Sequence, residues 1–381
     1  MSTDPARSAV VSSCPHCASL PPEAVAAVFR AVGEPLSVER FPLPVCRGSE
    51  VLVRIRCATI CGSDLHTYLG RRHGPTPSIL GHEMVGEIAA IGPDGARDFP
   101  GEALALGDRV TWSMVWSCGK CFYCGQGIPS RCEQLMKFGH EAITESYALS
   151  GGLAEFCHLP EGTAIFRVPA GLPDIVASPS NCATATVAAV FRKTGPVAGR
   201  HVLVVGAGML GLTACAMAAA GGARSVIAVE PDPVRLEMAR AFGATDGIEA
   251  GLGEQAMLAR ILPLTEGRGV DLAVEFSGHP EAVEAALALL RPGGRLLAAG
   301  ATFPSRPVQL SAEQIVRRSL EIVGVYNYQP HDLGVALDFL AAQHSRFPFE
   351  KLVSASFPMA RANEAMDFAA TGRSPRVAVI P

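Results

Sequence analysis

The sequence predicts an α/β protein built from a β-rich domain and a second domain in which helices wrap a parallel sheet. From about residue 50 to 166, short alternating strands are broken by Gly, Pro and Asp clusters, which is typical of a β-rich domain. Beyond residue 183, apolar strands alternate with helical segments at the spacing of a parallel sheet. A chain of 381 residues has room for both.

The individual elements follow from these patterns. In the β-rich part the expected strands are 51–57, 84–92, 109–112 and 154–159. In the second part we expect strands at 201–205, 225–230, 270–278 and 294–300, and helices at 209–221, 233–243 and 280–290. Two further helical stretches, 333–343 and 361–372, precede a last strand at 376–380, so the C-terminus is expected to return to the first domain.

The composition excludes several classes of protein. Lys and Arg number 32 against 36 Asp and Glu, so the formal charge is −4 and no basic field exists to bind duplex nucleic acid. The 12 cysteines are diluted through the chain, and its start lacks the basic cluster and apolar stretch of an export signal. The uncharged run from Val202 onward contains a glycine turn, which divides it into a strand and a helix rather than a membrane span. We therefore expect a cytoplasmic protein with reduced thiols or bound metal, whose partner is a small molecule.

The strongest motif is a compact cysteine loop. The sequence CGKCFYC is followed, seven residues later, by a fourth cysteine, and this spacing predicts a tetrahedral zinc ion held by four thiolates. With all four positions occupied by sulfur, the ion has no place for substrate and is expected to be structural. Two disulfides are the alternative, which the CxxC spacings and the missing export signal disfavour. The ligands are Cys118, Cys121, Cys124 and Cys132. A separate CPHC pair, Cys14 and Cys17, receives no function.

A glycine turn predicts a dinucleotide site. The sequence GAGMLG follows an expected strand and opens an expected helix, and the next strand ends at Glu230, about 20 residues further on. The glycines permit a tight turn and let N–H groups at the helix start approach a pyrophosphate. Glu230 would bind the ribose hydroxyls and repel a 2′-phosphate, which favours NAD over NADP. Arg235 either reaches the ribose or a phosphate or lies on a solvated helix face. The residues of the turn are Gly206, Gly208, Met209, Leu210 and Gly211.

A second, dispersed metal site is indicated by ligand types alone. Cys61 in CGSDLH, His82 in GHE and Cys182 in SNCATAT offer two sulfurs and an imidazole, which with an open position would hold a catalytic zinc ion. Each residue taken singly also suits a buried core position. Their separation in the chain provides no fixed spacing to test.

Together these motifs resemble the zinc-dependent medium-chain alcohol dehydrogenases, in which CGSDLH, GHE, the cysteine loop, NCATAT, GAGMLG and EFSG follow one another in this order. The resemblance implies a GroES-like catalytic domain in two segments, 1–183 and 326–381, with a flexible tail over about the first 22 residues. It implies a Rossmann dinucleotide-binding domain at 184–325. It also implies a homodimer or homotetramer.

The resemblance further implies roles for single residues. Cys61, His82 and Cys182 would bind catalytic zinc, with Glu83 as an alternative ligand. Asp64 would orient His82, although an Asp here also suits a simple turn cap. Ser63 would take the substrate proton and His66 would pass it on through the cofactor ribose, although a surface role is also open to His66. Near the nicotinamide and the cofactor the matching positions are Thr186, Ser277 and Gly278.

The expected reaction is the reversible oxidation of an alcohol to an aldehyde or ketone, with two zinc ions per chain and NAD. Aldehyde dismutation or thiol-adduct oxidation on the same fold is the first alternative, and a non-catalytic zinc-binding regulatory protein is the second. The nearest subgroup, which shares NCATAT and KFGHE, has members linked to phosphonate metabolism. Arg71, Arg72 and His73 would then meet an anionic substrate, although three such residues in a loop also suit solvated surface.

Overall fold

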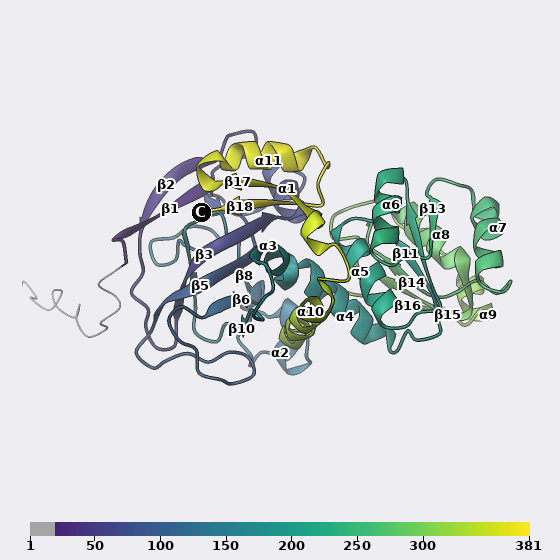
Figure 1. Cartoon of the computed structure of the whole chain (residues 1–381), viewed down its shortest axis with the longest axis horizontal. Helices are drawn as coiled ribbons and strands as arrows, with labels where there is room; N and C mark the ends of the chain where they lie inside the picture. Colours follow the sequence, from purple (N-terminus) through teal and green to yellow (C-terminus); the bar gives the residue numbers. More distant parts are fainter. Residues whose placement is uncertain (1–19) are drawn as a thin grey trace, which may run out of the picture.

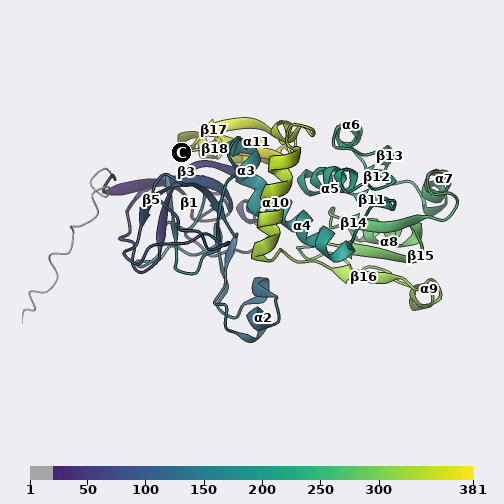
Figure 2. The same cartoon turned by 60° about the horizontal axis from the view of Figure 1, so that its bottom comes forward.

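The computed structural model describes residues 20–381, which form two domains in contact through helices α4 (Ala183–Thr194) and α10 (Pro330–Gln343). In Figures 1 and 2 the N-terminal strands lie on one side, the parallel sheet lies on the other, and α10 stands between them. The CPHC pair, Cys14 and Cys17, and nearly all of the expected N-terminal tail lie outside the described residues.

The β-rich domain contains a sheet of order β2-β1-β4 and a larger sheet of order β10-β6-β5-β3-β18-β17, in which β9 also pairs with β3. Strand β18, at the end of the chain, lies antiparallel to β3 and parallel to β17, so the C-terminal segment completes the sheet that the N-terminal segment begins. The bounds are β1 Glu23–Phe29, β2 Ser37–Pro42, β3 Val51–Ile60, β4 Ser78–Ile79, β5 Glu83–Ile91, β6 Arg109–Trp112, β9 Phe156–Leu159, β10 Ile165–Arg167, β17 Val353–Pro358 and β18 Arg376–Ile380.

Strands β1 and β2 extend the β structure ahead of residue 50, where the sequence pattern was expected to begin. The two strands pair antiparallel over their whole length. Polar and apolar residues alternate where one face of a strand meets water, but β1 is buried over most of its residues and therefore lacks that alternation. A covered strand of this kind is hard to tell from a short apolar segment of a helix.

The parallel sheet predicted beyond residue 183 is confirmed. Its order is β13-β12-β11-β14-β15-β16, the arrangement of a doubly wound dinucleotide fold. Alternate residues of β11 serve opposite faces: Val202 and Val204 pack in the core with α5 and α6, while Leu203 and Val205 pack with α7 and α8. The bounds are β11 His201–Val205, β12 Ser225–Glu230, β13 Asp246–Glu249, β14 Val270–Glu275, β15 Leu290–Ala298, β16 Glu321–Gly324, α5 Met209–Ala220, α6 Pro233–Ala241, α7 Glu254–Leu264, α8 Pro280–Leu289 and α9 Ala312–Arg317.

The remaining short elements position loops and ends. The hairpin of β7 (Val115–Trp116) and β8 (Met136–Lys137) carries the cysteine loop, which contains α2 (Phe122–Gly125) and the 3-10 turn η2 (Pro129–Arg131). Helix α11 (Ala362–Ala370) packs on β17 and β18. The other elements are α1 Gly62–Tyr68, α3 Asp174–Ala177, η3 Ser178–Asn181, η4 Phe349–Leu352 and η5 Met359–Arg361.

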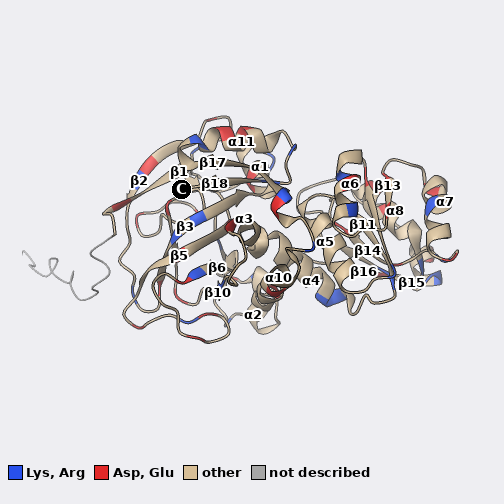
Figure 3. Ribbon diagram, viewed as in Figure 1, with Lys and Arg blue, Asp and Glu red and all other residues tan. Residues whose placement is uncertain are grey.

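The helices of residues 20–381 include none with the length and apolar character that crossing a membrane requires. Lys and Arg are interspersed with Asp and Glu along the described ribbon of both domains (Figure 3). This mixture agrees with the small net charge of the whole sequence.

Candidate active site

The site begins at the junction where β3 ends and α1 starts. Cys61 is the N-cap residue of α1, and its N–H donates to the Asp64 carboxylate at 2.9 Å. The other carboxylate oxygen of Asp64 accepts the Gly81 N–H at 3.3 Å and lies 3.0 Å from His82 Nδ1. Since Asp64 occupies Nδ1, the imidazole is oriented with Nε2 available to a metal. Burial alone would lower the pKa of His82, but the charges of Asp64 and Cys61 raise it to about 9.

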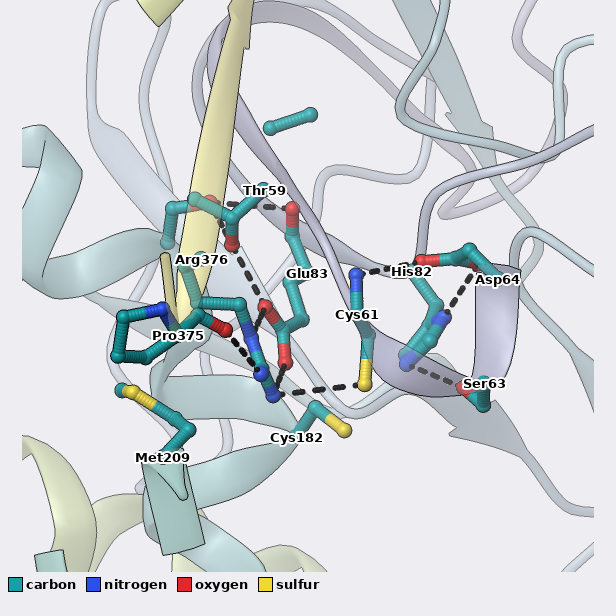
Figure 4. Close-up of polar contacts among 12 residues, drawn as sticks. Thr59, Cys61, Ser63, Asp64, His82, Glu83, Cys182, Met209, Pro375 and Arg376 are labelled. Carbon is teal, nitrogen blue, oxygen red and sulfur yellow. Dashed lines mark hydrogen bonds and ion pairs between the residues drawn. The ribbon is translucent and has the colours of Figure 1, made fainter. Parts of the chain in front are cut away.

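Four donor atoms converge beside this junction (Figure 4). One ligand atom from each of Cys61, His82, Glu83 and Cys182 lies within 4.8 Å of the others. The residues come from the start of α1, the loop before β5, the first residue of β5 and the N-cap of α4. Two cysteines and one histidine are the protein ligands of the catalytic zinc ion in alcohol dehydrogenase. The residues present here therefore fit a zinc ion.

The thiols of Cys61 and Cys182 have pKa values that are shifted in opposite directions. The Cys182 thiol donates toward Cys61, and this contact, together with the nearby Arg376 charge, holds the pKa of Cys61 well below its usual range. The same contact and burial raise the pKa of Cys182. Cys61 is therefore the first of the pair to become a thiolate, which is the form that binds metal.

Glu83 is already engaged by other residues. Its carboxylate accepts from Arg376 Nε and Nη2, both at 2.7 Å, and from the Thr59 hydroxyl at 2.7 Å. Arg376 Nη2 also lies 3.4 Å from Cys61 Sγ. Glu83 is fully buried, and burial raises its pKa to about 7 although Arg376 pairs with it. To become a zinc ligand, the carboxylate would have to give up part of this arginine pair.

Arg376 was not found from the sequence. It is the first residue of β18 and lies 293 residues from Glu83 in the chain. The residue is 6% exposed, and only the sheet pairing of β18 with β3 brings it to the donor group. An arginine in RVAVI has no local pattern that distinguishes it from a surface cation.

A cavity of about 350 Å³ opens onto the donor group. Cys61, Ser63, His66 and Cys182 line it, together with the glycine turn. Ser63 Oγ lies 3.3 Å from His82 Nε2. Buried His66 Nδ1 has no hydrogen-bond partner within the described structure, and burial followed by the charges of Arg71 and Arg72 lowers the pKa of this ring. Ser63 and His66 thus offer a hydroxyl and a neutral imidazole on one turn of α1.

His140, from the KFGHE segment, is a further site residue that the sequence did not single out. Its ring centroid lies 5.1 Å from that of His82. Arg72 Nη2 lies 2.8 Å from His140 Nδ1, so the imidazole accepts from the guanidinium. Burial, followed by the charge of Lys137, holds the pKa of His140 well below its usual range. Of the three residues predicted to meet an anionic substrate, Arg72 lines the cavity, while Arg71 and His73 are exposed and outside its lining.

The glycine turn is shaped as a dinucleotide cradle. Gly206 has a φ of +89°, and a Cβ on Gly211 would lie 1.7 Å from the Gly206 carbonyl oxygen, so both positions need glycine. A Cβ on Gly208 would meet nothing within 4 Å, and the residue borders open space at the start of α5. The backbone here has the shape that admits a pyrophosphate at a helix N-terminus.

A second cavity, of about 580 Å³, shares Gly208 and Phe276 with the first. Glu230, Arg235 and Ser277 line it, whereas Thr186, Met209, Leu210 and Gly211 line the first cavity. Glu230 accepts the Ala207 N–H at 2.7 Å at the end of β12. The predicted cofactor residues therefore line two adjoining cavities, one of which contains the donor group. This arrangement fits an extended dinucleotide.

Two of these cofactor-side residues already have protein partners. Arg235 donates to the Gly372 carbonyl at 3.0 Å, so it bridges to the segment before β18 rather than lying free on a helix face. Ser277 donates to the Glu275 carboxylate at 2.6 Å, and the same oxygen accepts the Gly278 N–H at 2.7 Å. These contacts hold the turn after β14 in place.

The four cysteines of the loop between β7 and β8 also converge, with their sulfurs within 4.8 Å of one another. The sulfur atoms lie 3.5 Å apart in the pair Cys121 and Cys124 and also in the pair Cys118 and Cys132. This distance is too long for a disulfide bond. Backbone N–H groups lower the pKa of Cys121 to about 6. Four converging sulfurs fit a tetrahedral zinc ion.

Comparisons with known proteins agree with this geometry. Residues 47–170 match the alcohol dehydrogenase GroES-like domain, and residues 210–342 match the zinc-binding dehydrogenase family. An L-threonine 3-dehydrogenase of Bacillus licheniformis is 30% identical over 361 residues, covering 93% of this chain and 98% of the relative. A sorbitol dehydrogenase of Bacillus subtilis is 32% identical over 330 residues, covering 85% and 88%. An alcohol dehydrogenase crystal structure from Thermotoga maritima has a TM-score of 0.89 at 27% identity, covering 94% and 99%. The predicted pair of GroES-like and Rossmann domains is confirmed.

Proposed function

This chain belongs to the zinc-dependent medium-chain alcohol dehydrogenase family, and we propose that it catalyses the NAD-linked, reversible oxidation of an alcohol to an aldehyde or ketone. The predicted class of enzyme, an oxidoreductase acting on CH–OH groups, is confirmed by the relatives. The observation that carries the proposal is the convergence of Cys61, His82 and Cys182 in the cavity that adjoins the glycine turn.

The proposed chemistry divides between the bound groups and the residues of the chain. When bound, zinc would lower the pKa of an alcohol and the nicotinamide would accept the hydride. Cys61, His82 and Cys182 would hold the metal, and Asp64 would keep His82 in the required tautomer. Ser63 Oγ would take the hydroxyl proton, and His66 on the same helix would receive a proton at its unpartnered Nδ1.

We propose NAD as the preferred cofactor because Glu230 borders the cavity at the end of β12, where its charge would repel a 2′-phosphate. Arg235 would reduce this preference, but its side chain is tied to the Gly372 carbonyl. We propose a second, structural zinc ion at the four-cysteine loop. From the subgroup resemblance we further propose an anionic alcohol of the phosphonate type as substrate.

Metal content and turnover of ligand variants test the function. Zinc-loaded protein should contain two zinc equivalents per chain and reduce NAD with an alcohol panel faster than NADP. Cys61→Ala and His82→Ala should each retain one zinc equivalent, keep the fold by circular dichroism, and lose turnover by at least about 1,000-fold. Cys57→Ala, a buried cysteine outside the donor group, is the matched control. Undiminished turnover in zinc-depleted Cys61→Ala would overturn the proposal.

A further inference from the structure

Two cations face the proposed reaction cavity without a negatively charged partner. Arg72, after α1, and Lys137, the last residue of β8, line the same cavity as Cys61, Ser63 and Cys182. Both side chains are half-buried. Within the described part of the chain neither forms an ion pair, and the Arg72 side chain bonds only to the neutral acceptor His140.

The nearby carboxylates are engaged elsewhere. Asp64 serves His82 and two backbone N–H groups, and Glu83 pairs with Arg376. Glu141 accepts the backbone N–H of Lys137 at 2.6 Å, not the ammonium group of that residue. The wall formed by Arg72 and Lys137 therefore carries two positive charges that nothing in the described fold neutralises.

The two cations belong to a different domain from the dinucleotide cradle, although Gly208 and Gly211 of that cradle line the same cavity. Arg72 follows α1 and Lys137 ends β8, both in the β-rich domain, whereas the glycine turn lies at the start of α5. His140 accepts from Arg72 at 2.8 Å, and its ring centroid is 5.1 Å from that of His82. The His140 ring thus contacts the Arg72 guanidinium and lies beside His82, a proposed zinc ligand. A group bound there would lie on the β-rich side of the cavity, beside the donor group.

A cation that lines a cavity can pair with an anion that enters it, and a guanidinium presents a planar fork that matches the oxygens of a carboxylate or phosphate. We propose that Arg72 and Lys137 form a subsite for an oxyanion carried by a short alcohol substrate, with His140 as a positioning residue. The proposal rests on the alcohol dehydrogenase function argued above. Of the residues that the sequence predicted to meet an anion, the proposed subsite keeps Arg72. Its second cation, Lys137, comes from a separate segment of the chain.

Short primary alcohols that differ in their terminal group test the subsite. The zinc-loaded enzyme with NAD should be compared on 1-propanol, 3-hydroxypropionate, 2-hydroxyethyl phosphate and 2-hydroxyethylphosphonate. We expect at least one of the three anions to exceed 1-propanol in kcat/KM, and the ranking among them distinguishes a carboxylate from a phosphorus oxyanion. Arg72→Ala and Lys137→Met should each reduce the ratio of kcat/KM for the preferred anion to that for 1-propanol by about 10-fold or more, chiefly through KM.

Arg71→Ala is the matched control, because Arg71 neighbours Arg72 but is exposed and outside the cavity. Arg72→Lys, which keeps the charge but not the fork, should recover part of the loss if the variant folds. Anion binding at the subsite can also be measured with an anion that does not react. Inorganic phosphate or acetate should inhibit 1-propanol oxidation competitively in the parent enzyme, and this inhibition should be weaker in Arg72→Ala. NADH affinity, measured by fluorescence, reports any effect on the cofactor.

The possible failures are distinguishable. If 1-propanol is oxidised but no anion is preferred, the subsite and the proposed anionic substrate are both wrong, and the alcohol dehydrogenase activity stands. If Arg72→Ala behaves as Arg71→Ala does, the subsite alone is wrong. If Arg72→Ala weakens NADH binding without changing the substrate ratio, the cations serve the cofactor and the subsite is likewise wrong. If neither neutral nor anionic alcohols reduce NAD with the zinc-loaded protein, the proposed function itself fails.

Discussion

At the scale of single residues, the geometry of the candidate zinc site depends on Asp64. Its two oxygens serve the Cys61 N–H, the Gly81 N–H and His82 Nδ1, and the residue is 1% exposed. An asparagine has one carbonyl oxygen in place of two carboxylate oxygens, so at least one of these donors would lose its partner. The side chain would also no longer support the basicity of His82.

We therefore expect Asp64→Asn to weaken zinc binding at the candidate catalytic site by about 10- to 100-fold, with a parallel loss of kcat. Competition with a chromogenic chelator measures the affinity, and the four-cysteine site in the same molecule is an internal reference. Asp338→Asn, an exposed carboxylate on α10, is the control for loss of one charge. Unchanged affinity and kcat in Asp64→Asn would show that His82 is oriented by the surrounding backbone alone.

At the scale of elements, the loop between β7 and β8 has little regular structure, and besides its four sulfurs it is held by contacts of Gly127, Ser130 and Arg131 with the segment after β16. Its regular structure is limited to α2 and η2, and Phe122 and Tyr123 are exposed. The loop contacts the segment that follows β16, where the guanidinium carbon of Arg131 lies 4.1 Å from the ring centroid of Tyr326. A metal bound by the four thiolates would therefore fix both the loop and this contact.

Cys121→Ala should lower Tm by about 5 °C or more, because loss of one thiolate weakens the metal and frees the loop. Differential scanning calorimetry measures the change, and chelator-treated parent protein should melt close to the variant. Lys120→Ala, an exposed change in the same loop with all four cysteines intact, should leave Tm near the parent value. Equal melting of Cys121→Ala and Lys120→Ala would mean that the cysteine loop adds nothing to stability.

At the scale of the whole molecule, what the sequence predicted well was what is local in the chain. The glycine turn and the cysteine loop each lie within one short segment, and the strand and helix rhythm beyond residue 183 led directly to the parallel sheet. The candidate zinc donors required a resemblance, because 121 residues separate Cys61 from Cys182 in the numbering. Arg376 had no local signal, and although Arg72 was predicted to meet an anionic substrate, nothing in the sequence indicated that Lys137 lines the same cavity. Both features depend on strand register and loop packing that single segments do not encode.

The ion pair of Arg376 and Glu83 joins the two ends of the β-rich domain inside its core. Arg376 is 6% exposed and Glu83 is fully buried, so removal of one partner leaves a buried charge without compensation. Arg376→Met should therefore reduce the free energy of unfolding of the zinc-loaded protein by about 3–5 kcal/mol. Glu83→Gln should be destabilising for the same reason. The double variant should lose less than the sum of the two single changes, because neither charge then remains unpaired. Urea denaturation of all four proteins measures this coupling, and additive losses would show that the pair does not bind the C-terminal strand to the site.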